Sequence, residues 1–240
     1  MRQEPEVQRT KDKTLVEEKI DGAWIWTDGS VKPAVAAQYF LQPPERLRGE
    51  RIGQGGRGQA FKIDLHGQPV VLRFYQRGGA MAWLNRDRYF SLTARTSRAR
   101  DEFDIMTTLA DRGLPVPRPV AAMANRVIGF AFRLAIMTPF IENQGTLADC
   151  DSHDAWYNAG FAIGQLHRMG VWHADLNVYN VLIDKESKAW LLDFDRARQG
   201  VQLHYRLLAN LVRLRRSVVK VCPQRIEHHW PILLKGYDAA

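Results

Sequence analysis

Three oxygen-bearing side chains in the C-terminal part of the chain have the types and order of a phosphoryl-transfer site. Residues 173–180 read H-A-D-L-N-V-Y-N and contain Asp175 and Asn180, and Asp193 follows in a D-F-D motif. Carboxylate and amide oxygens are ligands that Mg²⁺ accepts, and a separate carboxylate can take the proton of a hydroxyl group. These residue types therefore indicate a magnesium–nucleotide site with a base beside it.

A predicted β-hairpin would bring these side chains together. The apolar runs 181–183 and 190–192 flank a polar turn, as the two strands of a hairpin do. Asn180 comes directly before the first strand and Asp193 directly after the second, so the two lie side by side if the strands pair antiparallel. Asp175 lies on the loop that enters the hairpin. We therefore predict that all three side chains converge, with Asn180 and Asp193 as metal ligands and Asp175 as the catalytic base; a solvent-facing loop around an ordinary hairpin is the alternative.

Glycines form a second phosphate-binding signal nearer the N-terminus. Gly53, Gly55 and Gly58 lie in the string G-Q-G-G-R-G, which joins predicted strands at 51–52 and 59–63. A dinucleotide-binding glycine motif would have to open a helix instead. A glycine loop between strands suits a flap whose backbone N–H groups approach phosphate oxygens. A plain hairpin turn is the alternative.

A cation and a carboxylate complete the predicted nucleotide site. Arg73 ends the predicted strand 70–74, in the position where the motif V-A-I-K places its lysine. Val71 shares a strand face with Arg73, so we expect Val71 to cover the adenine while Arg73 reaches the phosphates. Glu102, on the next predicted helix, is expected to orient Arg73, because an Arg–Glu pair can be bidentate. A solvated helix surface is the alternative for Glu102, and Lys62 is an alternative cation.

Length and composition are those of an ordinary globular protein. The 240 residues, 45% of them hydrophobic, can form one large domain or two lobes around a cleft. No apolar run approaches the roughly 20 residues that span a bilayer, and the polar N-terminus lacks the apolar region of a signal peptide. Cys150 and Cys222 have no metal-binding spacing and are expected to be free thiols. A cytoplasmic location fits these features.

The net charge of +8 favours an anionic partner, which could be a nucleic acid, a phosphorylated substrate or an anionic membrane surface. We expect no nucleic acid, because the chain shows no recognised RNA-binding motif and no interleaved surface aromatics. The predicted tail helix, 203–221, is basic on one side and apolar on the other. Its apolar side is expected to pack against the domain, with membrane contact as the alternative, since an interfacial helix needs that side free.

The remaining patterns predict an α+β chain. Helical periodicity covers 96–112 and 156–169, and extended segments are expected at 24–26 and within 128–141. We predict a flexible N-terminal tail at 1–14 and a single domain at 15–240, with lobes of about 15–137 and 138–240.

Five blocks of the sequence resemble the protein-kinase-like superfamily over about 50–197, and more specifically the 3-deoxy-D-manno-octulosonic acid (Kdo) kinase family of lipopolysaccharide kinases. They are G-G-R-G at 55–58, L-R-F-Y-Q-R-G-G at 72–79, G-L-P-V-P-R-P at 113–119, H-A-D-L-N at 173–177 and D-F-D-R at 193–196.

The resemblance implies a two-lobed kinase-like fold, with a small antiparallel sheet in the N-lobe and a mostly helical, truncated C-lobe. It implies ATP and Mg²⁺ as cofactors. The acceptor it implies is the 4-hydroxyl of Kdo in a Kdo-containing lipid A precursor, at the cytoplasmic side of the bacterial inner membrane, where the protein would be peripheral. It indicates no oligomeric state.

The sequence departs from protein kinases at two positions. Asn177 stands where they carry a catalytic-loop lysine, so other cations or Mg²⁺ must stabilise the transition state. Asp195 replaces the glycine of D-F-G, which removes a flexible hinge. The alternatives are a kinase for another core sugar such as heptose, a kinase for a small-molecule alcohol such as an aminoglycoside, and a non-catalytic basic nucleotide-binding protein.

Overall fold

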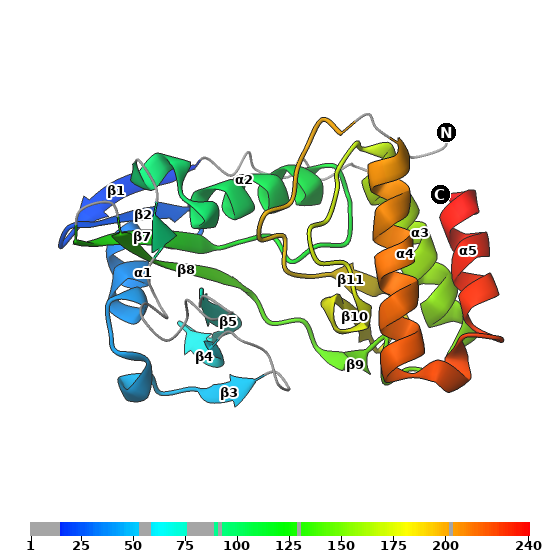
Figure 1. The fold of residues 1–240 in the computed structure, drawn as a ribbon. Helices are drawn as coiled ribbons and strands as arrows, with labels where there is room; N and C mark the ends of the chain where they lie inside the picture. The colour runs from blue at the N-terminus through cyan, green and yellow to red at the C-terminus, as the bar shows by residue number, and fades with distance from the viewer. Residues whose placement is uncertain (1–14, 53–58, 76–88, 91–92, 129–130, 202–203) are drawn as a thin grey trace, which may run out of the picture.

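An antiparallel sheet forms one half of the molecule and helices form most of the other half (Figure 1). The computed structural model describes residues 15–52, 59–75, 89–90, 93–128, 131–201 and 204–240. The predicted tail at 1–14 and the glycines Gly53, Gly55 and Gly58 lie outside the described residues.

The large sheet has eight strands in the order β1-β2-β7-β8-β5-β4-β3, and β6 also pairs with β8. Each of these pairs is antiparallel, which agrees with the predicted sheet. Strand β2 contains the predicted extended segment 24–26, whereas β1 and β7 had no counterpart among the predicted elements and enlarge the sheet. The strands are β1 (Val16–Ile20), β2 (Ala23–Thr27), β3 (Glu50–Ile52), β4 (Gln59–Leu65), β5 (Gln68–Phe74), β6 (Tyr89–Phe90), β7 (Ala121–Ile128) and β8 (Ala131–Pro139).

Helices cover both faces of this sheet because alternate residues of its strands are apolar on both sides. On β7, Ala122 and Ala124 belong to the core cluster under α2 (Arg98–Asp111), whereas Ala121 and Met123 belong to the cluster under α1 (Pro33–Phe40). Figure 1 shows α2 running along one face of β7 and β8, with α1 on the other face. Strand β7 is therefore buried on both sides, and β8, which pairs with both β7 and β5, lies beside it in the centre of the sheet.

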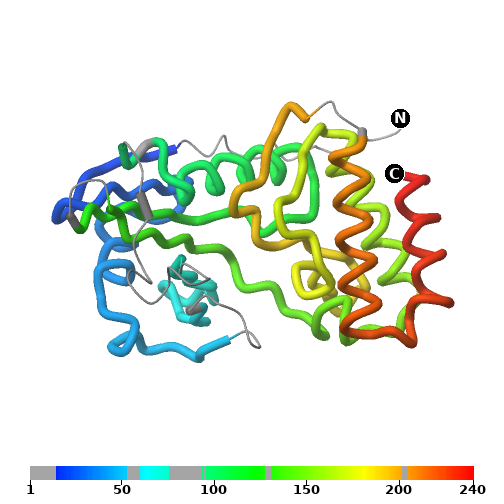
Figure 2. The backbone as a smooth tube through the Cα atoms, viewed as in Figure 1, coloured from blue at the N-terminus to red at the C-terminus, as the bar shows by residue number. Residues whose placement is uncertain are grey.

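The helical half contains α3 (His153–Arg168), α4 (His204–Val221) and α5 (Trp230–Ala239), next to a three-stranded sheet in the order β11-β10-β9. Its strands are β9 (Asn143–Thr146), β10 (Val181–Asp184) and β11 (Ala189–Leu191). Figure 2 shows the green segment after β8 leading from the large sheet into this half, with α4 and α5 at its far side. Short 3₁₀ helices lie at Pro44–Arg46, Ala94–Thr96, Val178–Asn180 and Pro223–Arg225.

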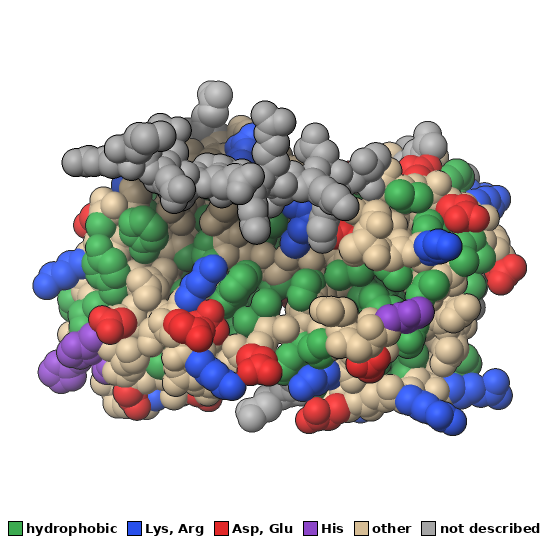
Figure 3. Space-filling view, turned by 180° about the vertical axis from the view of Figure 1, so that it is seen from behind, with side chains coloured by type: hydrophobic (Ala, Val, Ile, Leu, Met, Phe, Trp, Pro, Cys, Tyr) green, Lys and Arg blue, Asp and Glu red, His purple; other side chains and the backbone are tan. Residues whose placement is uncertain are grey.

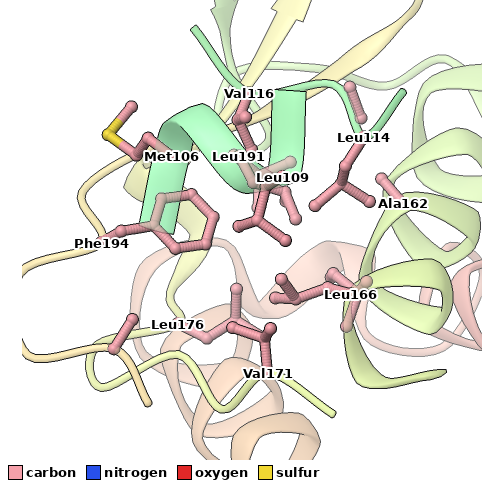
Figure 4. Close-up of a cluster of buried hydrophobic side chains, with 14 of the residues drawn as sticks. Met106, Leu109, Leu114, Val116, Ala162, Leu166, Val171, Leu176, Leu191 and Phe194 are labelled. Atoms are coloured by element: carbon pink, nitrogen blue, oxygen red, sulfur yellow. The ribbon is translucent and has the colours of Figure 1, made fainter. Parts of the chain in front are cut away.

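A common hydrophobic core joins the two halves. Leu109 at the end of α2 packs among residues of the helical half, and Phe194 of the D-F-D motif points toward it (Figure 4). Leu176, from the loop that carries Asp175, is also fully buried in this cluster. The segments that bear the predicted catalytic residues are therefore anchored by their apolar neighbours in sequence.

Two expectations from the bulk properties can be compared with the structure. Cys150 is half-buried and Cys222 is buried, and both are free thiols, as predicted. Within the described residues, none of the helices combines the length and apolar character needed to cross a bilayer.

Helices α3 and α5 pack with their backbones in contact, and glycines make this possible. A Cβ atom on Gly160 of α3 would overlap the carbonyl oxygen of Leu233 in α5. Similarly, a Cβ on Gly236 of α5 would overlap the carbonyl oxygen of Tyr157 in α3. The neighbouring atoms are backbone atoms, so they cannot move aside as a side chain could.

We predict that Gly160→Ala destabilises the protein, by about 2 kcal/mol or more, because overpacking a tight contact typically costs about 1–3 kcal/mol. The sign is diagnostic, since Gly→Ala inside a helix otherwise stabilises by roughly 1 kcal/mol. Urea unfolding followed by circular dichroism would measure the change. Gln165→Ala, at a partly exposed position of the same helix, is the control and should have little effect. A stabilised Gly160→Ala variant would contradict the close packing of α3 on α5.

Candidate active site

A cavity of about 650 Å³ lies between the large sheet and the hairpin β10–β11. Ala60 and Val71 line it from the sheet, and Leu182 and Leu192 line it from the hairpin segment. Val71 is therefore in the cavity wall, on the same side as Arg73. A slot with apolar walls and a polar end suits a flat, partly apolar ligand that carries charge at one end.

Arg73 forms the polar end of this slot and links two carboxylates. Its Nη2 donates to both oxygens of Glu102, at 2.5 and 2.7 Å, and its Nη1 donates to Oδ1 of Asp193 at 2.8 Å. The pairing with Glu102 was predicted; the contact with Asp193 was not. Lys62, the alternative cation, is not among the residues lining the cavity, and its Nζ lies 3.9 Å from the ring centroid of Phe140.

Glu102 is buried and receives donors from three directions. Its side chain is 1% exposed, and besides Arg73 it accepts hydrogen bonds from the Tyr75 hydroxyl and, at 3.1 Å, from the backbone N–H of Phe194. Burial raises the pKa of Glu102 to about 7, while the positive charge of Arg73 opposes this shift. Burying a carboxylate costs free energy unless it is paired and hydrogen-bonded. The need to satisfy Glu102 therefore holds Arg73, Tyr75 and the backbone of Phe194 in place around it. A solvated helix surface, the alternative for Glu102, is thus wrong.

The hairpin places Asn180 and Asp193 beside each other, as its geometry predicts. The backbone N–H of Leu192 donates to the carbonyl oxygen of Asn180 at 2.9 Å, and both predicted metal ligands line the cavity. Asp193 has φ +61°, a left-handed conformation that aspartate tolerates better than most residues and that is frequent at functional sites. Burial acts to raise the pKa of Asp193, but the charge of Arg73 and the hydrogen bonds from Arg73 and from the backbone of Asp195 outweigh it, so this pKa lies below its ordinary value.

The donor oxygens at this point fit a magnesium ion that is also bound by phosphates. Asn180 directs its Nδ2 to the carbonyl oxygen of Asp175 at 2.8 Å, which turns its Oδ1 away from that contact. Arg73 occupies only one oxygen of Asp193. Among the described residues, no group of three or more His, Cys, Asp or Glu side chains could hold a metal by itself. Mg²⁺ in phosphotransferases commonly uses one or two protein ligands together with phosphates and water, so two are sufficient.

Asp175 departs from the predicted convergence of three side chains. Its carboxylate is 53% exposed and is not part of the cavity lining that includes Asn180 and Asp193. Instead, Oδ1 of Asp175 accepts from Nε and Nη2 of Arg213 in α4, at 3.1 and 2.6 Å. The prediction that all three meet at one point is therefore wrong: two face the cavity, and the third lies beside them, held by an arginine.

His173 anchors the loop that carries Asp175. Its Nε2 donates to the carbonyl oxygen of Leu192 at 2.9 Å, and its Nδ1 accepts from the backbone N–H of Asp175 at 3.1 Å, in the tautomer that satisfies both contacts. The ring packs edge-on against Phe194, with 4.9 Å between ring centroids. Burial lowers the pKa of His173, so the ring is neutral and ties the loop to the D-F-D segment.

Helix α4 holds the other side of the same loop through three polar side chains. Asn210 accepts from the backbone N–H of His173 at 3.0 Å and donates to its carbonyl oxygen at 2.6 Å. Ser217 accepts from the backbone N–H of Val178 at 3.1 Å, and Arg213 bonds Asp175 between these two contacts. The spacing of 210, 213 and 217 places the three on one helix face. This polar stripe beside an apolar side was the signal in the sequence that could have revealed the contact.

Asn210 is itself fixed by a buried histidine. The Nε2 of His167 in α3 lies 3.2 Å from Oδ1 of Asn210, and its Nδ1 lies 2.9 Å from the hydroxyl of Tyr237 in α5. Burial lowers the pKa of His167 to about 4, against the opposing effect of its hydrogen bond to Asn210. The ring is therefore neutral near pH 7 and links the three helices to the loop.

Asn177, in the position of the protein-kinase lysine, shapes the loop. Its Oδ1 accepts from the backbone N–H of Tyr179 and its Nδ2 donates to the carbonyl oxygen of Asp175, both at 2.9 Å. An amide here cannot supply charge, and the cation next to Asp175 comes from Arg213 instead. The basic tail helix thus packs on the domain as predicted, but Arg213 is engaged at the site rather than free for a membrane.

The fold resembles that of a solved structure. The solved structure titled "WaaP in complex with acyl carrier protein" aligns with a TM-score of 0.55 over 85% of each chain, at 15% sequence identity. This likeness confirms the predicted two-lobed kinase-like, α+β fold.

Sequence comparison identifies the family. A 3-deoxy-D-manno-octulosonic acid kinase of Xylella fastidiosa (strain 9a5c) is 38% identical over 201 residues, which cover 80% of each chain. A protein of the same name from Stenotrophomonas maltophilia (strain R551-3) is 38% identical, and the match covers 79% of each chain. Another, from Xanthomonas campestris pv. campestris (strain B100), is 36% identical, and the match covers 85% of this chain and 86% of the relative. The model of the lipopolysaccharide kinase (Kdo/WaaP) family matches residues 44–237. With the predicted resemblance confirmed, the chain belongs to the lipopolysaccharide kinase (Kdo/WaaP) family and is a phosphotransferase that uses an alcohol group as acceptor.

Proposed function

We propose that this lipopolysaccharide kinase transfers the γ-phosphate of ATP to the 4-hydroxyl of Kdo in a Kdo-lipid A precursor. The observation that carries the phosphotransferase assignment is Arg73, held between Glu102 and Asp193 at the polar end of an apolar slot. The similarity to proteins named Kdo kinase supports the choice of acceptor.

In this proposal the slot between the sheet and the hairpin receives the nucleotide. Val71 and Leu182 would enclose the adenine from opposite sides, and Arg73 would contact the phosphates. The glycines Gly53, Gly55 and Gly58 would cover the phosphates with their backbone N–H groups.

Asn180 and Asp193 would hold Mg²⁺, which neutralises charge on the phosphates during transfer. Arg73 keeps Asp193 ionised and oriented, which a metal ligand requires. No step of the acceptor chemistry then depends on Glu102 directly; Glu102 acts through Arg73 and through the backbone of Phe194.

Asp175 would orient the acceptor hydroxyl and accept its proton. Both contacts from Arg213 go to Oδ1 of Asp175, so Oδ2 is the oxygen that would face the hydroxyl. His173 and Asn180 hold the backbone on either side of this carboxylate. A base fixed in this way has the orientation that general base catalysis needs.

We infer that the protein works as a peripheral protein at the cytoplasmic side of the inner membrane, where a lipid-linked acceptor is available. The net charge of +8 supports attraction to an anionic membrane surface. On the face seen in Figure 3, basic and acidic side chains are interspersed around apolar ones. The basic helix α4 lies in front of α3 in Figure 1, on the side opposite to that view, and is the better candidate to face anionic lipid.

An acceptor panel tests the proposed function. Purified protein would be incubated with Mg-ATP and with a Kdo-lipid A precursor, a heptose-containing core, an aminoglycoside or casein. We expect ATP consumption above background with the Kdo acceptor alone, and the phosphate at the 4-hydroxyl by nuclear magnetic resonance. Phosphorylation of heptose or aminoglycoside in its place would replace the proposed acceptor, and no transfer to any acceptor would favour nucleotide binding without catalysis.

Asp175→Asn should reduce turnover by about 10²–10⁴-fold, the usual effect of removing a general base, while Mg-ATP affinity stays close to normal. Asp193→Ala should instead weaken the binding of Mg-ATP, because Asp193 lines the nucleotide slot and Asp175 does not. Rapid-quench kinetics and calorimetric titration would separate the two effects. Near-normal turnover in Asp175→Asn would remove its proposed role.

Arg73→Lys tests whether charge alone is sufficient. Lysine has one nitrogen and cannot contact Glu102 and Asp193 as the two terminal nitrogens of Arg73 do. We expect kcat/KM for ATP to fall about 10- to 100-fold, which corresponds to one lost charge-assisted hydrogen bond. Arg133→Lys, at an exposed position of β8, is the matched control. Unchanged steady-state kinetics for Arg73→Lys would show that only a positive charge is needed.

A further inference from the structure

A second cavity, of about 500 Å³, lies beside the loop that carries Asp175. Trp172 and Ala174 line it from this loop, and Tyr205, Arg213 and Arg216 line it from α4. Its volume is within the range of about 300–1,000 Å³ that is common for small-ligand sites. It is distinct from the nucleotide slot, which shares none of these residues.

Arg213 connects this cavity with the proposed base. The guanidinium bonds Oδ1 of Asp175 and also forms part of the cavity wall. A ligand in the cavity would therefore contact the arginine that binds Asp175. An acceptor bound there would need only to extend its hydroxyl past Arg213 to reach the base.

The charge of the cavity is one-sided. Its lining includes Arg213 and Arg216 and no acidic residue. Within the described part of the chain, Arg216 has no ion-pair partner, whereas Arg213 is paired with Asp175. Because an arginine guanidinium is planar and carries several donors, it matches the geometry of a carboxylate. Arg216 is thus available to a ligand that carries one.

The remaining walls suit a sugar ring. Trp172 and Tyr205 have aromatic faces with a polar tip, a combination that can cover the C–H face of a sugar and leave its hydroxyls to polar partners. Leu208 adds an apolar contact from α4.

We propose that this cavity is the acceptor subsite and that it recognises an acidic sugar through its carboxylate, with Arg216 as the residue that binds this group. The proposal rests on the proposed function, since Kdo is a sugar acid. It adds the location of the sugar, the group that is recognised and the residue that selects it. A neutral core sugar such as heptose would lack the partner for Arg216.

The test compares two acceptors and three proteins. The acceptors are the Kdo-lipid A precursor and the same molecule with the Kdo carboxylate converted to its amide, which removes the charge and keeps the hydroxyls. The proteins are the unsubstituted chain, Arg216→Gln and the control Arg215→Gln. The control also removes one positive charge from α4, but Arg215 does not line the cavity.

We expect the unsubstituted protein and Arg215→Gln to have a KM about tenfold lower for the acid than for the amide, as one charge-assisted hydrogen bond at a partly exposed position would give. Arg216→Gln should raise the KM for the acid to that for the amide, with kcat and the KM for ATP unchanged. The loss of discrimination is the decisive readout, because a merely structural effect would change both acceptors equally.

Two results would overturn the subsite. An unchanged acid-to-amide ratio in Arg216→Gln would show that the carboxylate is bound elsewhere. An equal loss on both acceptors would assign Arg216 to a group that they share, such as a phosphate of the lipid. Failure of the proposed function gives a different pattern, because the unsubstituted protein would then phosphorylate neither acceptor.

Discussion

The buried carboxylate of Glu102 is the contact on which the nucleotide end of the site depends. It lies on α2, yet its donors come from β5 through Arg73 and from the D-F-D segment through the backbone of Phe194. A carboxylate without partners at this depth would cost several kcal/mol, so the three segments are stable only together. Arg73 passes the constraint on to Asp193, the proposed metal ligand. One desolvated charge thereby sets the relative position of sheet, helix and hairpin.

The acceptor end has a different organisation, because its support comes from α4. The amide of Asn177 leaves the catalytic loop without the cation that protein kinases place there, and Arg213 brings a cation from outside the loop. Asn210 and Ser217 bind the loop backbone on either side of that arginine. Helix α4 thus supplies the cation from outside the loop, and Asn177 within the loop is used to hold the loop backbone instead.

Local patterns were sufficient to predict the elements that bear the motif residues. The predicted runs 181–183 and 190–192 correspond to β10 and β11, and the predicted helix 96–112 corresponds to α2. The Arg73–Glu102 pair could be predicted because a strand and the following helix each presented one suitable residue. Contacts from distant segments could not: Arg213 and Asp175 are 38 residues apart, and only the fold brings them together.

Strand β7 and helix α5 were missed for reasons of composition. The segment A-A-M-A-N at the start of β7 consists mostly of small residues that favour helices, and its strand pairing is imposed by β2 and β8 on either side. Helix α5 is short and contains Gly236, which is unfavourable inside a helix by propensity, whereas Pro231 lies in the first turn, where proline is tolerated. The glycine is needed there because the backbone of α3 leaves no room for a side chain.

The support of the loop by α4 has a consequence for synthesis of the protein on the ribosome. Every residue of the H-x-D, Asn180 and D-F-D pattern is translated before Asn210, Arg213 and Ser217 are. A nascent chain that ends after Asp195 therefore contains all the motif residues, but its loop at 173–178 lacks the partners that fix its backbone and the arginine that orients Asp175. Asp175 can therefore be held in place only after α4 has left the ribosome and packed against the loop. All residues that line the nucleotide slot are translated before α4, so we expect the slot to be complete before the base is positioned.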